Sequence, residues 1–401
     1  MCASLQDVGE AACQEMRKAE PERDIREWYK AFMWTSTRFT ERFGRRYPIV
    51  QGPMGGGAST PELVAAVSGA GGLGSLGCYH LEPAAIVRAA ADIRRLTDEP
   101  FGLNLWIPRE REDPGSLSGP EAARALARIQ PYRDELGLPP LAEPPAPTVQ
   151  GFERQFDAVL EARPAVFSFV FGLLPEPMVA EAHRQGIALI GTATTVEEAE
   201  ALEASGVDFV CASGFEAGGH RGSFLRPAEQ GLTGTLSLVP QVVSAVRIPV
   251  LAAGGIADGR GVAAALVLGA AAAQIGTAFL MCRESGASDR HRAALADRSR
   301  ARRTTLSRAY TGRLARMLAN RYTDEMAQPP AELLPWPHQN ELTRELRYEA
   351  ARAGRDDLLA FYGGQSAPLA SLRSAADLVA TLAAETGAAF EPFAMLREPA
   401  C

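Results

Sequence analysis

The chain alternates short apolar runs with longer, alanine-rich runs in which apolar residues recur at helical spacing, and Gly, Pro or Asn residues separate the runs. Short apolar runs with such boundaries are typical of buried parallel strands, and amphipathic runs are typical of helices that cover a sheet. Thr60 before Pro61 predicts an N-cap and a first-turn proline, and Pro83, Pro175 and Thr195 mark three further helix starts. The pattern therefore predicts a βα repeat.

The number of strands decides between two α/β folds. Eight strands alternating with helices over about 240 residues predict a TIM (β/α)8 barrel. The alternative is an open, doubly wound sheet. The predicted strands are residues 48–54, 73–77, 101–106, 165–171, 188–193, 209–213, 249–255 and 272–278.

Two regions interrupt the repeat, one rich in proline and one rich in arginine. We expect the first to cross the barrel mouth and the second to form a helical lid. The predicted organisation is an N-terminal helical extension (1–43), a cofactor-binding barrel (44–285) with an insertion at 107–147, a helical lid (286–360) and a C-terminal segment that returns to the barrel (361–401).

The segment at residues 261–281 is long and nearly uncharged, as a membrane span would be. Its apolar residues are mostly Ala, and Gly269 interrupts it. A helix of small residues followed by a short barrel strand gives the same composition, and the charged Asp258 and Arg260 just before it fit that interpretation better. We therefore expect no membrane association.

Composition narrows the class of partner. The chain has 401 residues, 46% of them hydrophobic, and 41 Lys and Arg against 48 Asp and Glu give a net charge of −7. This charge gives no electrostatic basis for binding nucleic acid or an anionic membrane. The six cysteines lack CxxC or other metal-binding spacing, so we expect free thiols, no metal site and, with no export signal, a cytoplasmic protein.

Glycines follow the last two predicted strands. Gly254 and Gly255 come after the seventh strand, and Gly276 and Thr277 after the eighth. In a (β/α)8 barrel these loops lie side by side at the carboxyl end, where bare backbone N–H groups bind phosphate. The sequence therefore predicts an anion site there.

The first and third strands end in residues suited to a flat ring. Met54, in "QGPMGGG", offers a polarizable side chain, and the glycines after it allow a close approach. Asn104 can donate to and accept from a heteroaromatic edge. A ring site facing a phosphate site indicates a cofactor such as FMN.

The segment "GFEAGGHRGSF" (214–224) carries the candidate catalytic residue, His220, on a glycine-rich loop after the sixth strand. We interpret Arg221 as structural, Cys211 as a packed thiol, and Glu216 either as an orienting partner of His220 or as a solvent-facing carboxylate. Four aromatic residues of the later chain are candidates for roofing the pocket: Tyr310, Tyr322, Trp336 and Tyr362.

These residues stand in an ordered set of motifs: "QGPM", "AAVSGAGGLGSLG", "FGLNL", "GFEAGGHRGSF", "LAAGGIADGRG", "QIGTAFL" and "GGQSA". The set resembles the FMN-dependent nitronate monooxygenases, over more than half of the chain. The resemblance implies a TIM barrel with bound FMN. It also implies oxidation of a nitronate or nitroalkane by dioxygen through flavin reduction and a substrate radical, with His220 as the base or the partner of the nitro group.

The resemblance also assigns cofactor contacts. Ser213 stands where the family often has Gln, and its shorter side chain would reach the flavin only through water. Gly52 stands where Ala is frequent. The positions that match flavin-contacting positions of the family are Met54, Asn104, Ser213, Gly219, Gly254, Gly255, Gly276 and Thr277, with Gln365 of "GGQS" as a further contact.

Three alternatives remain open at this stage. FMN-dependent enoyl-acyl-carrier-protein reductases share the barrel and a similar "EAGGH" segment, and use NAD(P)H. A specialised biosynthetic flavoenzyme on the same barrel would account for the long extensions. A flavin-binding protein without catalysis is the third. The expected partners are a small-molecule substrate and dioxygen, and a homodimer is compatible with the sequence.

Overall fold

The computed structural model describes residues 34–108, 117, 119–148, 150–327 and 333–395. Its eight-stranded parallel sheet has the order β1-β9-β8-β6-β5-β4-β3-β2, and a bridge between Val50 and Leu73 joins the first and last of these strands. The sheet is therefore a closed TIM barrel, as predicted, and the doubly wound alternative is wrong. The strands are β1 Ile49–Gln51, β2 Gly74–Gly77, β3 Phe101–Trp106, β4 Val166–Val170, β5 Ala188–Ala193, β6 Phe209–Ser213, β8 Val250–Ala253 and β9 Ala272–Ile275.

All eight predicted strands are present, but four of the predicted ranges extend too far at their carboxyl ends, three of them by more than one residue. The chain leaves β1 at Gly52, β8 at Gly254 and β9 at Gly276. Gly254 has a φ of +104°, which an L side chain rarely adopts. The glycines thus end the strands at the rim, where the predicted cofactor site lies.

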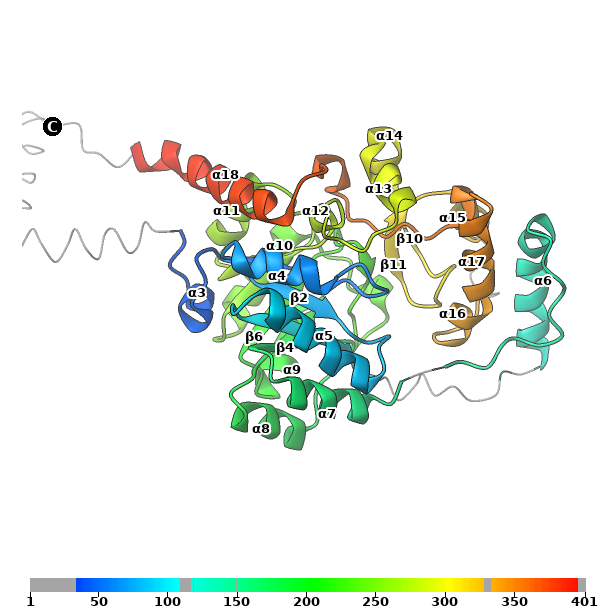
Figure 1. The fold of residues 1–401 in the computed structure, drawn as a ribbon, viewed down its shortest axis with the longest axis horizontal. Coiled ribbons are helices and arrows are strands. Elements are labelled where there is room, and N and C mark those ends of the chain that lie inside the picture. The colour runs from blue at the N-terminus through cyan, green and yellow to red at the C-terminus, as the bar shows by residue number, and fades with distance from the viewer. Residues whose placement is uncertain (1–33, 109–116, 118, 149, 328–332, 396–401) are drawn as a thin grey trace, which may run out of the picture.

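An outer layer of helices covers the barrel (Figure 1). Thr60 Oγ1 accepts from the N–H of Leu63, and Thr195 accepts from Glu198, so both predicted N-caps are confirmed. The eighth helical position is filled by α18 (Ala375–Met395), which packs against α11 and α4. The other helices of this layer are α4 Pro61–Gly69, α5 Pro83–Leu96, α7 Phe152–Ala162, α8 Glu176–Arg184, α9 Val196–Ala204, α10 Thr235–Ala245 and α11 Gly259–Val267.

The apolar segment 261–281 does not form one long helix. It contains most of α11, the strand β9 and the short helix α12 (Thr277–Leu280), with Gly269 at a φ of +95° between α11 and β9. The interpretation as a helix and a barrel strand is confirmed. Among the described residues, no helix combines the length and apolarity that crossing a membrane requires.

The helix α3 (Arg38–Phe43) closes the amino end of the barrel. Phe39 and Phe43 pack on Phe209, the first residue of β6, with ring centroids 6.0 and 5.4 Å away. These rings belong to the cluster that fills the barrel interior. Its other buried members are Val50, Leu73, Val166, Ala188, Ile190, Cys211, Leu251, Ala253 and Ala272. The part of the N-terminal extension before residue 34 lies outside the described residues.

The lid (286–360) packs around a core of its own and contains strands as well as helices. The strands β10 (Thr304–Ser307) and β11 (Ala315–Leu318) form an antiparallel pair. The prediction of a helical lid did not include them. The lid's helices are α13 Asp289–Ala296, α14 Arg298–Ala301, α15 Arg321–Glu325, α16 His338–Leu342 and α17 Arg344–Arg352.

The described part of the 107–147 insertion belongs with the lid (Figure 1). Its helix α6 (Gly119–Glu135) places the Tyr132 ring 4.8 Å from that of Tyr322, and Tyr132 Oη donates to Glu325 at 2.8 Å. The insertion therefore extends to the far side of the barrel mouth, where it supports the lid.

Replacing Phe39, which is fully buried in the barrel interior, by Ala tests the closing role of α3. We expect the free energy of unfolding to fall by about 3–5 kcal/mol, because the lost ring leaves a cavity. The same truncation at Leu236, whose side chain is 72% exposed, is the control and should change stability by less than about 0.5 kcal/mol. Urea denaturation measures both, and equal effects would contradict the role of α3.

Candidate active site

The loop that carries His220 is held as a strand of the lid's sheet. Residues Gly219–His220 form β7, which pairs antiparallel with β11 so that His220 lies opposite Ala315 and Gly219 opposite Arg316. Gly219 has a φ of +81°, a conformation that favours glycine. The segment between β6 and α10 thus leaves the barrel, joins the lid and returns, which fixes His220 between the two parts.

Arg221 anchors this loop from below. Its side chain is only 2% exposed, and it donates to the carbonyl oxygens of Gly214 at 2.7 Å, Ser213 at 3.0 Å and Gly231 at 3.2 Å. A planar guanidinium can satisfy several carbonyls at once, which a lysine cannot do. The structural interpretation of Arg221 is confirmed.

Glu216 departs from both sequence interpretations. Its carboxylate accepts hydrogen bonds from the backbone N–H and Oγ1 of Thr235, at the first turn of α10. It therefore ties the loop to α10 and does not orient His220. Cys211 is 1% exposed, and burial raises the pKa of its thiol to about 12, so the prediction of a packed thiol is confirmed.

The His220 ring is enclosed by residues from three parts of the chain. Its Nε2 lies 2.9 Å from Thr311 Oγ1 in the lid. Its ring centroid lies 5.0 Å from that of Trp106, the last residue of β3, and 5.5 Å from that of Tyr362 in the C-terminal segment. Among the described residues Nδ1 has no hydrogen-bond partner, so it is the ring nitrogen open to a ligand.

The surroundings keep this imidazole neutral. Burial, together with the guanidinium charges of Arg313 and Arg347, lowers the pKa of His220 to about 3. A neutral imidazole has one N–H donor and one acceptor nitrogen. His220 is therefore a weak base at pH 7.

The predicted phosphate loops lie next to the His220 loop. A Cβ on Gly254 would lie 3.0 Å from the Gly214 oxygen, and one on Gly255 would lie 3.5 Å from Glu216 Cβ. Gly255, Gly276 and Thr277 follow β8 and β9, which are neighbours in the barrel. In the described part of the chain, the backbone N–H groups of these three residues donate to no protein acceptor. An ideal Cβ on Gly276 would meet nothing within 4 Å, which leaves room beside the amides.

The C-terminal segment closes over the same loops. The Gly364 N–H donates to Thr277 Oγ1 at 2.9 Å, and the Gln365 N–H donates to the Glu216 carbonyl at 2.9 Å. A Cβ on Gly218 would lie 2.5 Å from the Gly364 nitrogen, so the two backbones can cross only where both are glycine. Gln365 is thus held at the rim through its backbone, next to Gly364, and its side chain is exposed.

Met54 and Asn104 form a second group on the rim. A Cβ on Gly77, at the end of β2, would lie 2.9 Å from the carbonyl carbon of Met54, and Gly77 is the register partner of Asn104. Asn104 Nδ2 donates to Ser168 Oγ at 2.9 Å. This group adjoins β9, because β1 pairs with β9 and the Gly52 N–H donates to the Ile275 carbonyl at 2.8 Å. All the predicted site residues therefore lie at the carboxyl end of the barrel, and Ser213 ends β6 between the two groups.

Sequence reasoning missed four residues that surround His220: Tyr79, Trp106, Thr311 and Arg313. Tyr79 stacks on Trp106 with ring centroids 3.6 Å apart, and Arg313 lies over the Trp106 ring at 5.2 Å. Trp106 carried a usable signal, because it follows Asn104 by two positions on the same strand and so shares its face. The other three are positioned by tertiary contacts, which leave no local pattern.

Of the four candidate roof aromatics, only two lie near His220. Tyr362 contacts its ring, and Trp336 lies 5.3 Å from Trp106. Tyr310 and Tyr322 are fully buried in the lid's core, where their rings lie 4.7 Å apart. They therefore stabilise the lid and do not line the site.

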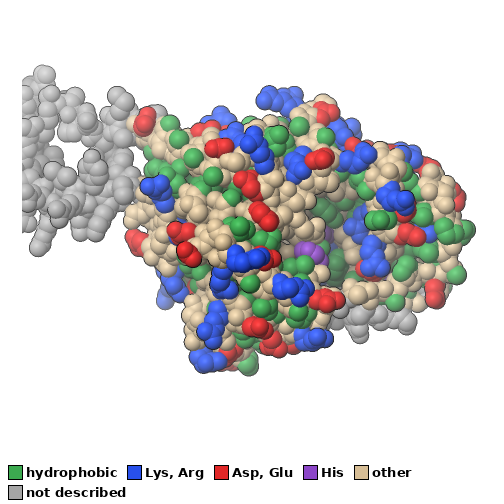
Figure 2. Space-filling view, viewed as in Figure 1, with side chains coloured by type: hydrophobic (Ala, Val, Ile, Leu, Met, Phe, Trp, Pro, Cys, Tyr) green, Lys and Arg blue, Asp and Glu red, His purple; other side chains and the backbone are tan. Residues whose placement is uncertain are grey.

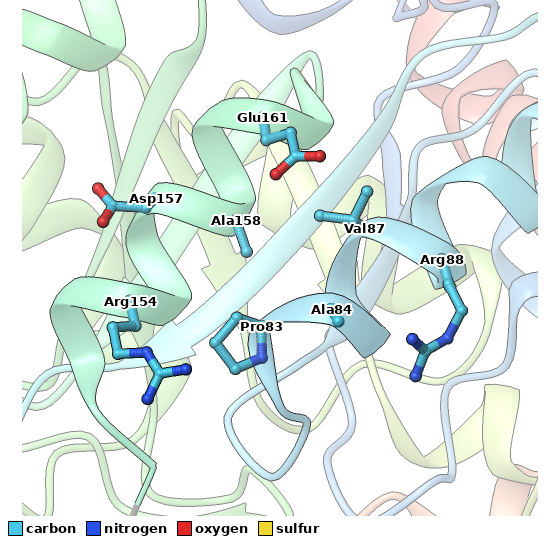
Figure 3. Close-up of a pocket in the computed structure, with 8 residues that line it drawn as sticks. All are labelled: Pro83, Ala84, Val87, Arg88, Arg154, Asp157, Ala158 and Glu161. Atoms are coloured by element: carbon cyan, nitrogen blue, oxygen red, sulfur yellow. The ribbon is translucent and has the colours of Figure 1, made fainter.

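Figure 2 shows a hollow between the barrel and the part of the molecule that holds α15, α16 and α17, with Lys and Arg side chains beside it. A separate groove of about 510 Å³ lies outside the barrel between α5 and α7 (Figure 3). Its lining is Pro83, Ala84, Val87, Arg88, Arg154, Asp157, Ala158 and Glu161. None of the predicted site residues lines this groove, so we place the candidate site at the barrel mouth.

The chain is similar to known proteins over most of its length. A family model described as nitronate monooxygenase matches residues 36–385. A probable nitronate monooxygenase from Staphylococcus aureus (strain Newman) is 40% identical over 354 residues, which cover 87% of this chain and 97% of that protein. A probable nitronate monooxygenase from strain JH9 is 40% identical over 353 residues, with the same coverage.

Solved structures agree with the family match. A nitroalkane oxidase from Streptomyces ansochromogenes has a TM-score of 0.80 and 40% identity, and the match covers 88% of this chain and 99% of that one. FabK from Thermotoga maritima has a TM-score of 0.67 and 28% identity, covering 90% and 99%. With a family model that spans most of the chain and relatives matched over nearly their whole length, the chain belongs to the nitronate monooxygenase family and is an oxidoreductase.

Proposed function

We propose that the protein binds FMN and oxidises a nitronate or a nitroalkane with dioxygen. Family membership supports the oxidation of nitro compounds. The observation that carries the proposal is the position of His220, held by the lid beside a barrel rim whose amides have no protein acceptor among the described residues. When bound, FMN would supply the one-electron redox chemistry that links oxidation of the nitronate to reduction of dioxygen, through a substrate radical.

The rim fits the phosphate of FMN. The N–H groups of Gly255, Gly276 and Thr277 are available, and bare backbone amides bind oxyanions. The open space beside Gly276 would hold the phosphate, and Gly364 and Gln365 would cover it. Phosphate sites in TIM barrels commonly lie at this position, after the last two strands.

The rim over β1, β2 and β3 fits the ring of the flavin. Met54 offers a polarizable side chain and Asn104 a polar edge, and both pair with residues of β2, Met54 with Leu76 and Asn104 with Gly77. Ser213 is the last residue of β6, and Gly219 directly precedes His220 in β7. These residues would hold the ring, with Ser213 acting through water.

His220 would act on the nitro group. Because Thr311 occupies Nε2, Nδ1 is the nitrogen that would meet a nitro oxygen by a hydrogen bond, or take the α-proton of a neutral nitroalkane. Its pKa of about 3 favours the first role in the protein without substrate. The same imidazole serves the second role only when the bound substrate makes it more basic.

Anaerobic mixing of the FMN-loaded protein tests the proposal. We expect ethylnitronate alone to bleach the flavin absorbance, because the family's chemistry begins with electron transfer from the nitronate. NADPH alone should leave the flavin oxidised over the same time. Stopped-flow absorbance at the flavin band measures both.

Two other outcomes contradict the proposal. Fast bleaching by NADPH and none by ethylnitronate indicates a reductase of the enoyl-acyl-carrier-protein type. No bleaching by either indicates a flavin-binding protein without this catalysis.

The variant His220→Asn tests the role of the imidazole. We expect it to retain FMN and to lower the rate of nitronate oxidation about 100-fold, as loss of a positioned hydrogen-bond donor does. With a pKa of about 3, His220 stays neutral from pH 5 to 8, so this factor should not change across that range. Steady-state oxygen consumption at several pH values measures it.

The matched control is His183→Asn, which changes a histidine whose side chain is 41% exposed on α8 and should leave the rate unchanged. If the ratio of wild-type to His220→Asn rates decreases below about pH 6.5, His220 titrates near its ordinary pKa, which would contradict the neutral role.

The variant Gly276→Val tests the phosphate site. Its side chain would project into the open space beside the amides, so we expect FMN affinity to fall about 100-fold while the fold persists. Gly119→Val is the control, since a Cβ there also meets nothing within 4 Å but lies at the start of α6. Fluorescence titration of FMN measures affinity, and equal affinity in the two variants would place the phosphate elsewhere.

A further inference from the structure

Thr311 is the hydrogen-bond partner that the lid supplies to the His220 ring. Its Oγ1 lies 2.9 Å from His220 Nε2, and the residue is only 4% exposed. Thr311 lies in the connection between β10 and β11, whereas His220 lies in the loop that leaves the barrel after β6. This one contact therefore links a side chain of the lid to the candidate catalytic ring.

The turn that carries Thr311 is held on both sides. The carbonyl oxygen of Tyr310 accepts from Thr343 Oγ1 at 2.6 Å. Gly312 has a φ of +82°, and a Cβ there would lie 2.5 Å from the Leu334 oxygen, so this turn packs directly on the backbone of another lid segment. The position of the Thr311 hydroxyl is therefore set by the packing of the lid.

The backbone of His220 is joined to the segment that follows this turn. His220 lies opposite Ala315 in the strand pairing, and the N–H of Arg221 donates to the Leu314 carbonyl at 2.8 Å. Both partners of the contact between Nε2 and Oγ1 thus stand on backbone that is fixed in the same place. Little side-chain freedom has to be lost to form this bond.

The hydroxyl of Thr311 has one hydrogen to donate. Its oxygen accepts from the backbone N–H of Arg313 at 3.4 Å, a turn that threonine commonly forms with the residue two positions later. Two acceptors lie within reach of the hydrogen, His220 Nε2 at 2.9 Å and the Arg313 carbonyl oxygen at 3.4 Å. The shorter contact is the stronger one, so the geometry favours donation to Nε2.

The direction of this bond decides what the other ring nitrogen can do. A neutral imidazole carries a single hydrogen, so if Nε2 accepts from Thr311, the hydrogen is on Nδ1. Nδ1 is the nitrogen open to a ligand, and in this tautomer it is a donor. In the opposite tautomer its lone pair would face the ligand and repel the oxygens of a nitronate anion.

We propose that Thr311 is a positioning residue that donates to His220 Nε2 and so places the single N–H of the ring at Nδ1, toward the nitro oxygens of the substrate. This inference rests on the proposed function for the identity of the substrate. It also separates the two roles of the imidazole, because a ring with its hydrogen on Nδ1 has no lone pair there to take an α-proton.

The first test compares the FMN-loaded full-length protein with Thr311→Val and Thr311→Ser. Valine keeps the shape of the side chain and removes the hydroxyl, so we expect kcat/KM for ethylnitronate to fall about 10-fold, the scale of one lost hydrogen bond. Serine loses the methyl group and keeps the hydroxyl, and it should stay within about threefold of the wild type. If the valine variant keeps the wild-type rate, or if both variants lose equally, the inference is wrong.

The matched control is Thr323→Val, which removes another buried hydroxyl from the lid. Thr323 is 3% exposed, and its Oγ1 accepts from the N–H of Asn320 at 2.9 Å and donates to the Asn320 carbonyl at 2.8 Å. We expect this variant to keep the wild-type kcat/KM. Fluorescence titration should give all these variants the same affinity for FMN.

A double-mutant cycle tests whether Thr311 acts through His220. In the His220→Asn background, Thr311→Val should change the rate of nitronate oxidation by less than about threefold, because the ring that it positions is gone. A full further loss of about 10-fold would show an effect that does not pass through His220 and would overturn the inference.

Nitrogen NMR of histidine-labelled, FMN-loaded protein reads the tautomer without any substrate. Nε2 couples strongly to both C–H protons of the ring and Nδ1 to one, and the signals that His220→Asn removes belong to His220. At pH 7 we expect a protonated Nδ1 and a bare Nε2, and Thr311→Val should shift the ring toward the other tautomer. A protonated Nε2 in the wild type would overturn the inference.

Failure of the proposed function looks different. A wild-type protein that does not oxidise ethylnitronate contradicts the assigned reaction, whereas the NMR measurement still decides the role of Thr311. The same measurement on the wild type decides it if Thr311→Val fails to fold or to hold FMN.

Discussion

The site depends on one short strand pairing, between Gly219–His220 and Ala315–Arg316. Without it the segment after β6 would be a glycine-rich loop with many conformations, and its histidine would have no fixed position. The pairing also joins the lid to the barrel at the candidate active site. Arg221 below the loop and Thr311 above it then hold the backbone and the ring separately.

The two parts of the molecule contribute different chemistry to the mouth. The barrel supplies backbone amides and small residues that allow a close approach, as at Gly255 and Gly276. The lid supplies side chains, including the guanidinium groups of Arg313 and Arg347, whose charges reach His220. A cofactor and a substrate would therefore be held by different elements, so lid residues can vary the substrate without altering the cofactor site.

The sequence predicted the barrel and most of its rim, because apolar runs and terminating glycines are local signals. It did not predict β10 and β11, whose short, partly polar strands form through pairing with each other and with β7. His220 and Thr311 are 91 residues apart, and the low pKa of His220 arises first from burial and then from the charges of Arg313 and Arg347, which only the fold brings near it. Arg313 looks like any surface arginine until the fold places three aromatic rings around it.

The last helix of the barrel, α18, is separated from β9 by the entire lid. During translation the lid is complete before α18 leaves the ribosome, and until then the surfaces of α11 and α4 that α18 covers face water. The apolar seam that Leu378, Val379 and Leu382 of α18 bury against the barrel is therefore the last one that synthesis can cover.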